Sequence, residues 1–279
     1  MDKAKTKIGV IFTLAVIAVL ISVFVVAKPP EGVAADVNPS NGHATVTIPP
    51  NAVEVAPGIF SLGSAVDVDG AVVEGFMVFH HRNGHTGGPG NGGTVGSTCY
   101  AFLANGAKWK NIEPWIVNPA NTESLTDSFV LNNLGLDIGK WESASSSNIL
   151  GSGSLTTATL VADTSSPDDV NEVYFADIGS AGAIAVTIVW GVFTGPPFAR
   201  KLVEWDMVYD DVDFSWSASG EAGKMDFENI ASHEIGHATG MGHPSDECTE
   251  ETMFRFASAG ETKKQTLEAG DITGINSLY

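Results

Sequence analysis

Three histidines and a glutamate within residues 233–243 carry the clearest chemistry in the chain, in the order H-E-x-x-H-x-x-G-x-x-H. His233 and His237 stand four positions apart, so on a helix they face the same side and can present ring nitrogens to one metal ion. A catalytic zinc takes three protein ligands and keeps a further position open. The pattern therefore predicts a zinc site in which His243 is the third ligand and Glu234 is the general base for water.

The third histidine can reach this metal only if the chain turns sharply after the helix. Gly240 stands where a helix that begins near Asp226 would end, and glycine adopts the left-handed conformation without a Cβ clash. Two other interpretations stay open. The histidines could belong to an ordinary helix, or they could hold a structural zinc that Cys248 closes as a fourth ligand. Glu234 favours the catalytic interpretation, because a structural site needs no carboxylate there.

This segment resembles the metzincin metalloproteases, and its surroundings resemble the matrixin branch. Metzincins have a methionine-containing turn beneath the zinc, and Met253 follows His243 by ten residues. The similarity to microbial matrixin-like domains covers roughly residues 113–279, including the stretches 201–209 and 260–279. It implies a zinc metalloendopeptidase that hydrolyses polypeptides, with Met253 as an apolar floor beneath the histidines and not as a ligand.

Two departures from the family pattern limit what the resemblance implies. Pro244 follows the third histidine, as in the serralysins, but the glycine-rich calcium repeats of that branch are missing. The histidine-rich loop that binds a structural zinc in animal matrixins is also missing, since no histidine lies between His85 and His233. We therefore expect one catalytic zinc and no second one.

The resemblance implies an α+β fold for residues 113–279. It consists of a twisted, mostly parallel sheet with an antiparallel edge strand, an active-site helix and a C-terminal helix. Residues 182–190 would form the edge strand above the cleft, and an exposed edge can bind an extended peptide as a further strand. Ser124 and Asp127 stand at capping-box spacing and predict the start of the first helix.

Three further regions are expected before the protease domain. Short β-branched segments separated by turn signals predict a small β-rich module over residues 52–112. It could be an inhibitory propeptide, or a surface-binding module in a protein whose zinc is only structural. Residues 28–51, rich in proline, glycine, asparagine and alanine, are typical of a linker. Residues 1–27 contain a basic start and a long apolar run, typical of a cleaved signal peptide or a membrane anchor. Both place the enzyme outside the cell, secreted or anchored.

The net charge of −19 lies entirely in residues 113–279, which hold 26 acidic and seven basic residues. This acidity excludes a nucleic-acid partner and is typical of a solvated acidic surface. We expect polypeptide substrates and a monomeric chain. Carboxylates can also bind Ca²⁺, although no spacing identifies a calcium site. The candidates are Asp163, Asp168, Asp169, Asp177, Asp210, Asp211 and Asp213.

The two cysteines and a cluster of histidines leave alternatives open. Cys99 and Cys248 could form a disulfide, as pairs in oxidising compartments commonly do, or remain free thiols. Cys99 could instead be a thiolate plug on the zinc, as in the latency switch of animal matrixins, although the arginine and proline that frame that switch are missing. The three histidines within residues 80–85 could bind a metal, but a solvated loop is favoured because no carboxylate accompanies them.

Overall fold

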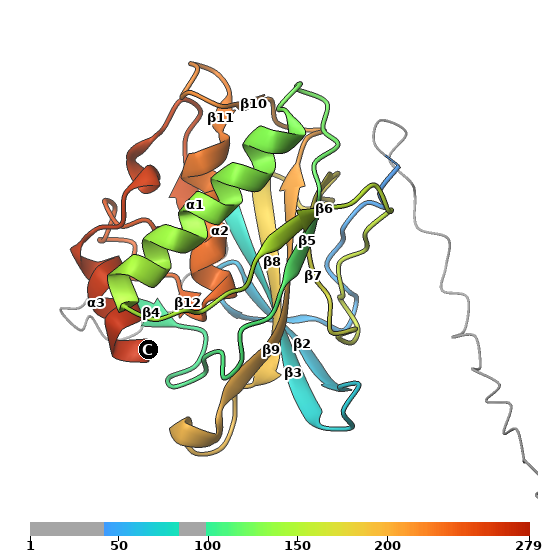
Figure 1. The fold of residues 1–279 in the computed structure, drawn as a ribbon, viewed down its shortest axis with the longest axis vertical. Coiled ribbons are helices and arrows are strands. Elements are labelled where there is room, and N and C mark those ends of the chain that lie inside the picture. The colour runs from blue at the N-terminus through green and yellow to red at the C-terminus, as the bar shows by residue number, and fades with distance from the viewer. Residues whose placement is uncertain (1–41, 84–98) are drawn as a thin grey trace, which may run out of the picture. The chain divides into compact units, whose positions relative to one another are not determined.

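The computed structural model describes residues 42–83 and 99–279, which form a mixed sheet and three α-helices (Figure 1). The α+β class predicted from the sequence is therefore confirmed. The helices are α1 (Asp127–Ser145), α2 (Phe227–Ala238) and α3 (Ala269–Leu278), with short 3-10 turns at Pro197–Ala199 and Lys263–Gln265. The strands are β1 (Val53–Ala56), β2 (Ile59–Val66), β3 (Val72–Arg82), β4 (Ala101–Phe102), β5 (Trp115–Asn118), β6 (Gly153–Leu155), β7 (Asn171–Ala176), β8 (Ala183–Val192), β9 (Lys201–Asp210), β10 (Trp216–Ser217), β11 (Met225–Asp226), β12 (Met241–Gly242) and β13 (Phe256–Ala257).

The main sheet has the strand order β1-β2-β3-β8-β9-β7-β5-β6, with β13 added in parallel beside β3. Strands β6, β5, β7 and β9 are parallel, whereas β8, β3, β2 and β1 each run antiparallel to the neighbour before them. The prediction that residues 182–190 form an exposed edge is wrong, because β8 pairs with β9 on one side and with β3 on the other. Nine of its ten residues are buried, as is typical of a central strand covered on both faces.

Strands β1 to β3 continue this sheet, so they do not form a module of their own. Val73, Met77 and Phe79 of β3 lie in the same buried cluster as Trp190 of β8. The boundary expected at residue 112 therefore falls inside one continuous sheet. The expected linker also packs from His43 onward, and the Nδ1 of this buried histidine lies 3.1 Å from the carbonyl oxygen of Phe175 in β7.

The two faces of the sheet are covered by different parts of the chain. On β9, Trp205, Met207 and Tyr209 belong to the core shared with the helices, whereas Val208 belongs to the core on the opposite face. This alternation is what the two-residue period of a strand dictates. Helices α1 and α2 lie on the same face of the sheet (Figure 1), where the indole N–H of Trp141 donates to the carbonyl of Ser232 at 2.9 Å.

Helix α1 begins later than its sequence pattern predicts. Ser124 is not the N-cap, because its backbone is left-handed with φ of 63°. Thr126 is the N-cap, and its Oγ1 accepts from the backbone N–H of Phe129 at 3.2 Å. The spacing of Ser124 and Asp127 was therefore misleading, since Thr126 offers the same capping chemistry two residues later.

The expected signal peptide or anchor, residues 1–27, lies outside the described residues. Within residues 42–83 and 99–279, no helix combines the length and apolarity needed to cross a membrane.

Candidate metal centre and active site

Helix α2 and the turn after it position the three histidines. Asp226 caps the helix, since its Oδ1 accepts from the N–H of Asn229 at 2.9 Å. The helix ends at Ala238, and Gly240 follows in the left-handed region with φ of 102°. A Cβ at Gly240 would lie 2.8 Å from the carbonyl oxygen of Ala107, so both conformation and space require glycine here. The chain then turns through β12 and brings His243 back to the helix.

The Nε2 atoms of the three histidines converge on one point. They lie 3.1 Å apart for His233 and His237, 3.1 Å for His237 and His243, and 3.2 Å for His233 and His243. The Nδ1 of His233 lies 2.6 Å from the carbonyl of Thr252, and that of His237 lies 2.9 Å from the carbonyl of Met241. A carbonyl only accepts, so in both histidines Nδ1 carries the proton and the Nε2 lone pair faces inward.

Burial lowers the pKa of all three histidines, so the rings are neutral. The lone pairs of His233 and His237 face each other and cannot satisfy each other by hydrogen bonds. Imidazole nitrogens in this arrangement are what a tetrahedral zinc binds, with a fourth position left open. The geometry therefore fits the zinc that the sequence motif predicts.

Glu234 lies beside this cluster and is fully buried. Its Oε2 accepts from the hydroxyl of Thr187 on β8 at 2.6 Å, and its Oε1 lies 3.1 Å from Nδ1 of His80 on β3. Burial raises the pKa of Glu234 to about 8, and the Thr187 hydrogen bond opposes part of that rise. A carboxyl with a pKa near neutral can both accept and release a proton.

His80 and Thr187 are two site residues that sequence reasoning missed. The solvated loop expected over residues 80–85 is wrong for its first half, because His80 and His81 lie buried in β3. His85 lies outside the described residues. The available signal for Thr187 was a hydroxyl within the apolar run of β8. No comparable local signal identified His80, since its position depends on which strand β3 pairs with.

Met253, the residue predicted to lie beneath the histidines, packs against helix α2. It is fully buried, and a Cβ at Gly236 would lie 2.2 Å from its sulfur atom. The glycine between Glu234 and His237 therefore lets the methionine approach the helix backbone. Asp271 of α3 fixes this turn, because its carboxylate accepts from the N–H groups of Thr252 at 2.7 Å and Met253 at 3.2 Å.

A buried lysine braces the same turn and was also missed. The Nζ of Lys264 donates to the carbonyl of Thr252 at 3.1 Å and to that of Phe254. Burial lowers the pKa of Lys264 to about 7. Thr252 therefore receives hydrogen bonds from both Lys264 and His233, which links the lysine to the orientation of a predicted zinc ligand.

A family model for matrixins matches residues 195–279, which include α2, all three histidines and Met253. Over these residues the chain is similar to the matrixin family. The resemblance drawn from the sequence reached back to residue 113, further than the match.

Relatives in plants and in humans are similar to this chain over part of its length. Metalloendoproteinase 1 of Glycine max is 40% identical over 75 residues, 25% of this chain and 24% of that protein. Metalloendoproteinase 2-MMP of Arabidopsis thaliana is 37% identical over 76 residues, 25% of this chain and 19% of that protein. Matrilysin of Homo sapiens is 36% identical over 69 residues, 25% of each chain. The chain spans a quarter or less of the length of these relatives.

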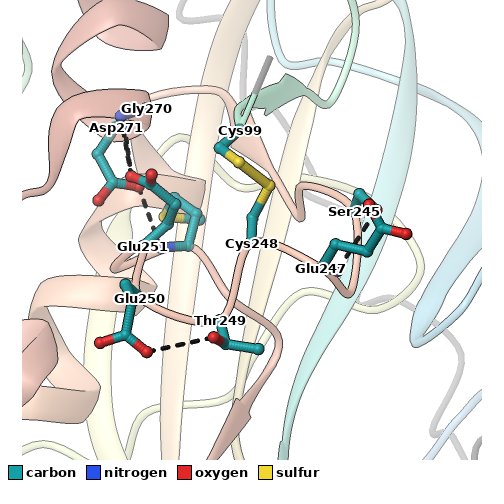
Figure 2. Close-up of a disulfide and its surroundings, with 10 residues drawn as sticks. Cys99, Ser245, Glu247, Cys248, Thr249, Glu250, Glu251, Gly270 and Asp271 are labelled. Carbon is teal, nitrogen blue, oxygen red and sulfur yellow. Dashed lines mark hydrogen bonds between the residues drawn. A yellow bond between two sulfur atoms is a disulfide. The ribbon is translucent and has the colours of Figure 1, made fainter. Parts of the chain in front are cut away.

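Cys99 and Cys248 form a disulfide that closes a separation of 149 residues (Figure 2). Of the three arrangements left open by the sequence, the structure has the bridge, and neither sulfur is a thiolate. Cys248 lies in the matrixin segment between His243 and Met253, next to Glu251. The Oε2 of Glu251 accepts from the N–H groups of Gly270 and Asp271 at 2.9 and 3.1 Å, which ties this loop to the start of α3 (Figure 2).

One of the seven calcium candidates lies in a cluster of ligand-type side chains among the described residues. Asp163 meets Glu204 and Asp206, with ligand oxygens within 4.8 Å of one another. Burial raises the pKa of Glu204 to about 9 and that of Asp163 to about 6. The carboxylate of Asp210, in contrast, is engaged by backbone N–H groups of Ile178, Val212 and Asp213. Glu204 and Asp206 of this cluster lie within the segment matched to matrixins, whereas Asp163 lies outside it.

Proposed function

We propose that the chain is a zinc-dependent metalloendopeptidase that hydrolyses peptide bonds in polypeptides. The observation that carries this proposal is the convergence of three neutral histidine nitrogens beside a buried carboxyl. His233, His237 and His243 would hold the zinc, which when bound supplies Lewis acidity to water and to the scissile carbonyl. The matrixin match over residues 195–279 supports the same activity.

The protein's own groups account for the proton transfers. Glu234 takes a proton from the attacking water at a carboxylate oxygen and returns it to the nitrogen of the leaving amine. The Thr187 hydroxyl donates to Oε2 and so fixes the carboxyl plane. The carbonyls of Thr252 and Met241 hold the rings of His233 and His237 in the tautomer that directs Nε2 inward.

Replacing the base while keeping the metal tests this function. Glu234→Gln preserves size and can still accept the Thr187 hydrogen bond, so we expect one zinc per chain and an unchanged fold. Cleavage of a denatured protein should fall by at least ~10² relative to the unmodified chain, and a chelator should stop it. Absence of chelator-sensitive cleavage by the unmodified chain, with zinc bound, would reject the proposal.

We further propose an extracellular location, with residues 1–27 either cleaved or retained as an anchor. Disulfides persist in oxidising compartments, so the Cys99–Cys248 bridge supports a site outside the cytoplasm. N-terminal sequencing of the exported protein, with and without detergent extraction, decides between secretion and anchoring. We expect a monomer with polypeptide substrates and no nucleic-acid partner.

We also propose that Asp163, Glu204 and Asp206 bind Ca²⁺. Glu204 Oε1 is buried and has no hydrogen-bond partner among the described residues, so a hard cation would satisfy it. Calcium should raise the melting temperature of the unmodified protein and leave that of Glu204→Gln unchanged. The same melting temperature with and without calcium in the unmodified protein would exclude the site.

A further inference from the structure

The loop between β8 and β9 presents the most exposed large apolar side chain among the residues that the structure describes. Phe198 is 84% exposed, whereas the next most exposed, Val68 and Val72, are each 66% exposed. The loop extends beyond the end of the sheet in Figure 1, and every residue from Thr194 to Ala199 is exposed. A single exposed apolar residue is ordinary on a protein surface. The surroundings of Phe198 therefore decide whether it has a role.

A short 3-10 turn that contains two prolines carries Phe198. Pro196 and Pro197 precede it, and the proline ring fixes the backbone φ at both positions. The N–H of Arg200 donates to the carbonyl of Pro197 at 3.2 Å, and its Nε donates to the carbonyl of Gly195 at 3.0 Å. The loop is thus closed at its base, so it has little conformational freedom to lose when Phe198 enters a partner.

A second loop packs against this one and brings further positive charge. The Nη1 of Arg200 donates to the carbonyl of Asn105 at 2.7 Å, and the N–H of Leu202 donates to the carbonyl of Lys108 at 3.1 Å. Both partners of the Arg200 guanidinium are neutral carbonyls, so its charge is not offset. Lys110 follows in the same loop, where it is exposed and has no ion pair within residues 42–83 and 99–279.

Positive charge is concentrated at these two loops in a chain with a net charge of −19. Residues 99–112 and 178–203 contain no acidic residue and four basic ones, Lys108, Lys110, Arg200 and Lys201. Lys201 lies 3.8 Å from Asp69, which offsets its charge. The other three form what we call the basic patch. Exposed charges more than about 8–10 Å away are largely screened at physiological salt, so a surface that meets Phe198 experiences this patch more than the net charge.

We propose that Phe198 and the basic patch dock the protein on an anionic lipid membrane. The phenyl ring would enter the boundary between headgroups and acyl chains, and Lys110 and Arg200 would lie at the level of the lipid phosphates. A projecting aromatic ring with cations at its base suits this partner. A stable protein partner would bury roughly 800 Å² on each side, whereas Phe198 projects from a narrow turn. The inference does not depend on the proposed endopeptidase function.

The docking end of the sheet lies away from the candidate active site. Thr187, which donates to Glu234, stands in the middle of β8, and the strand continues to Val192 before the loop begins. A strand rises about 3.3 Å per residue, so about 17 Å of β8 separates the Glu234 contact from the loop. Docking through Phe198 would therefore hold the protein at a membrane without covering the three histidines with lipid.

The test uses a chain that begins at Ala35, because Ala35–Tyr279 is one compact unit and the apolar run within residues 1–27 would itself bind lipid. Sedimentation measures binding to vesicles of phosphatidylcholine and to vesicles in which phosphatidylglycerol replaces part of that lipid. In roughly 0.1 M salt we expect at least ~10-fold stronger binding to the anionic vesicles, and most of this difference should disappear in roughly 1 M salt. Equal binding to both kinds of vesicle, or binding to neither, would overturn the proposal.

Two variants with matched controls assign the contact. Phe198→Ser should weaken binding to the anionic vesicles at least ~10-fold, whereas Leu136→Ser, at a side chain that is 65% exposed on α1, should leave it unchanged. Lys110→Glu should weaken binding at least ~5-fold. Lys224→Glu makes the same change in net charge outside the two loops and should have a smaller effect. Controls that weaken binding as much as their partners would contradict a localised contact.

A tryptophan probe tests insertion of the ring. The six tryptophans of the chain are at most 6% exposed, so Phe198→Trp adds an exposed indole to a background of buried ones. Brominated acyl chains should quench this added fluorescence on anionic vesicles and leave the fluorescence of the unmodified chain unchanged. Bound protein without added quenching would refute the insertion.

Two further measurements separate the proposal from its alternatives. Soluble polyglutamate tests for a protein partner, and Lys110-dependent binding to it by a chain that ignores anionic vesicles would overturn membrane docking. Glu234→Gln should bind vesicles as the unmodified chain does, since it lies outside the two loops. Loss of cleavage with vesicle binding kept would count against the endopeptidase function alone, and loss of vesicle binding in Phe198→Ser with cleavage of a soluble denatured protein kept is the result that the docking proposal predicts.

Discussion

Two histidine-bearing segments meet at Glu234, and they are held there in different ways. His233, His237 and His243 come from one helix and the turn after it, and carbonyls of Met241 and Thr252 orient two of the rings. His80 comes from a strand more than 150 residues earlier and reaches the same carboxyl through backbone pairing with β8 and with the segment after Met253.

The difference indicates which part of the site can be separated from the rest. The zinc-binding part is braced by side chains within residues 226–271, among them Asp226, Lys264 and Asp271. The strand part depends on contacts across the sheet. We therefore expect changes in the first part to affect the metal, and changes in β3 to affect access to the metal without loss of zinc.

The largest effect should come from removing a ligand. His237→Ala deletes one of three converging nitrogens, and we expect zinc affinity to fall by at least ~10², measured by competition with a chelator. His80→Ala and His81→Ala should keep one zinc per chain. If His80→Ala lost zinc as readily as His237→Ala, then the histidine of β3 would be part of the metal site and the division drawn above would be wrong.

The disulfide is the next largest contribution, and it belongs to the zinc-binding part. Replacing Cys99 and Cys248 by serine should lower the free energy of unfolding by ~2–4 kcal/mol, because a cross-link over a long stretch of chain restricts the unfolded state. Denaturant unfolding of the double variant measures the change. A loss near zero would mean that the bridge does not stabilise the loop between His243 and Met253.

The packing of helix α2 on Met253 predicts a smaller effect. A Cβ at Gly236 would lie 2.2 Å from the methionine sulfur and 2.8 Å from the ring of Trp141, so Gly236→Ala should cost ~1–3 kcal/mol of unfolding free energy. Gly135→Ala in α1 is the matched control, because a Cβ there meets nothing within 4 Å. It should be neutral or stabilising by up to ~1 kcal/mol. Similar losses in both variants would show that helix propensity, not the methionine contact, is responsible.

A change in pH dependence is expected at the acidic cluster of Asp163, Glu204 and Asp206. The folded protein raises the pKa of Glu204 from 4.5 to about 9, so between these values it holds a proton that the unfolded chain releases. In calcium-free solution the unfolding free energy should therefore fall as pH rises through this window, by up to ~1.4 kcal/mol per pH unit for one proton. Glu204→Gln should reduce that slope. An unchanged slope would assign the pH dependence to other groups.

The parts of the site that lie close together in the sequence could be predicted from it, and the parts joined by strand pairing could not. The spacing of His233, His237 and His243, together with Gly240, encodes a helix and a turn, and these depend on neighbouring residues. The position of β3 beside β8 does not depend on neighbouring residues in this way, because an alternating or apolar strand has no local feature that specifies which strand it pairs with. For the same reason the predicted edge strand was wrong and His80 was missed.

Lys264 was missed for a different reason. A lysine is ordinarily exposed, and the sequence gives no sign that this one is buried beneath carbonyls of the methionine turn. The α+β class of the fold followed from the resemblance to metzincins, and the mixed sheet with three helices agrees with it.

The most direct test of the central claim compares the unmodified chain and Glu234→Gln. Zinc content and cleavage of a denatured protein are measured on the same samples. We predict one zinc in both, chelator-sensitive cleavage by the unmodified chain and at least ~10²-fold slower cleavage by the variant. Equal cleavage by the two chains, or cleavage that persists without zinc, would contradict the assignment of His233, Glu234, His237 and His243 as the active site.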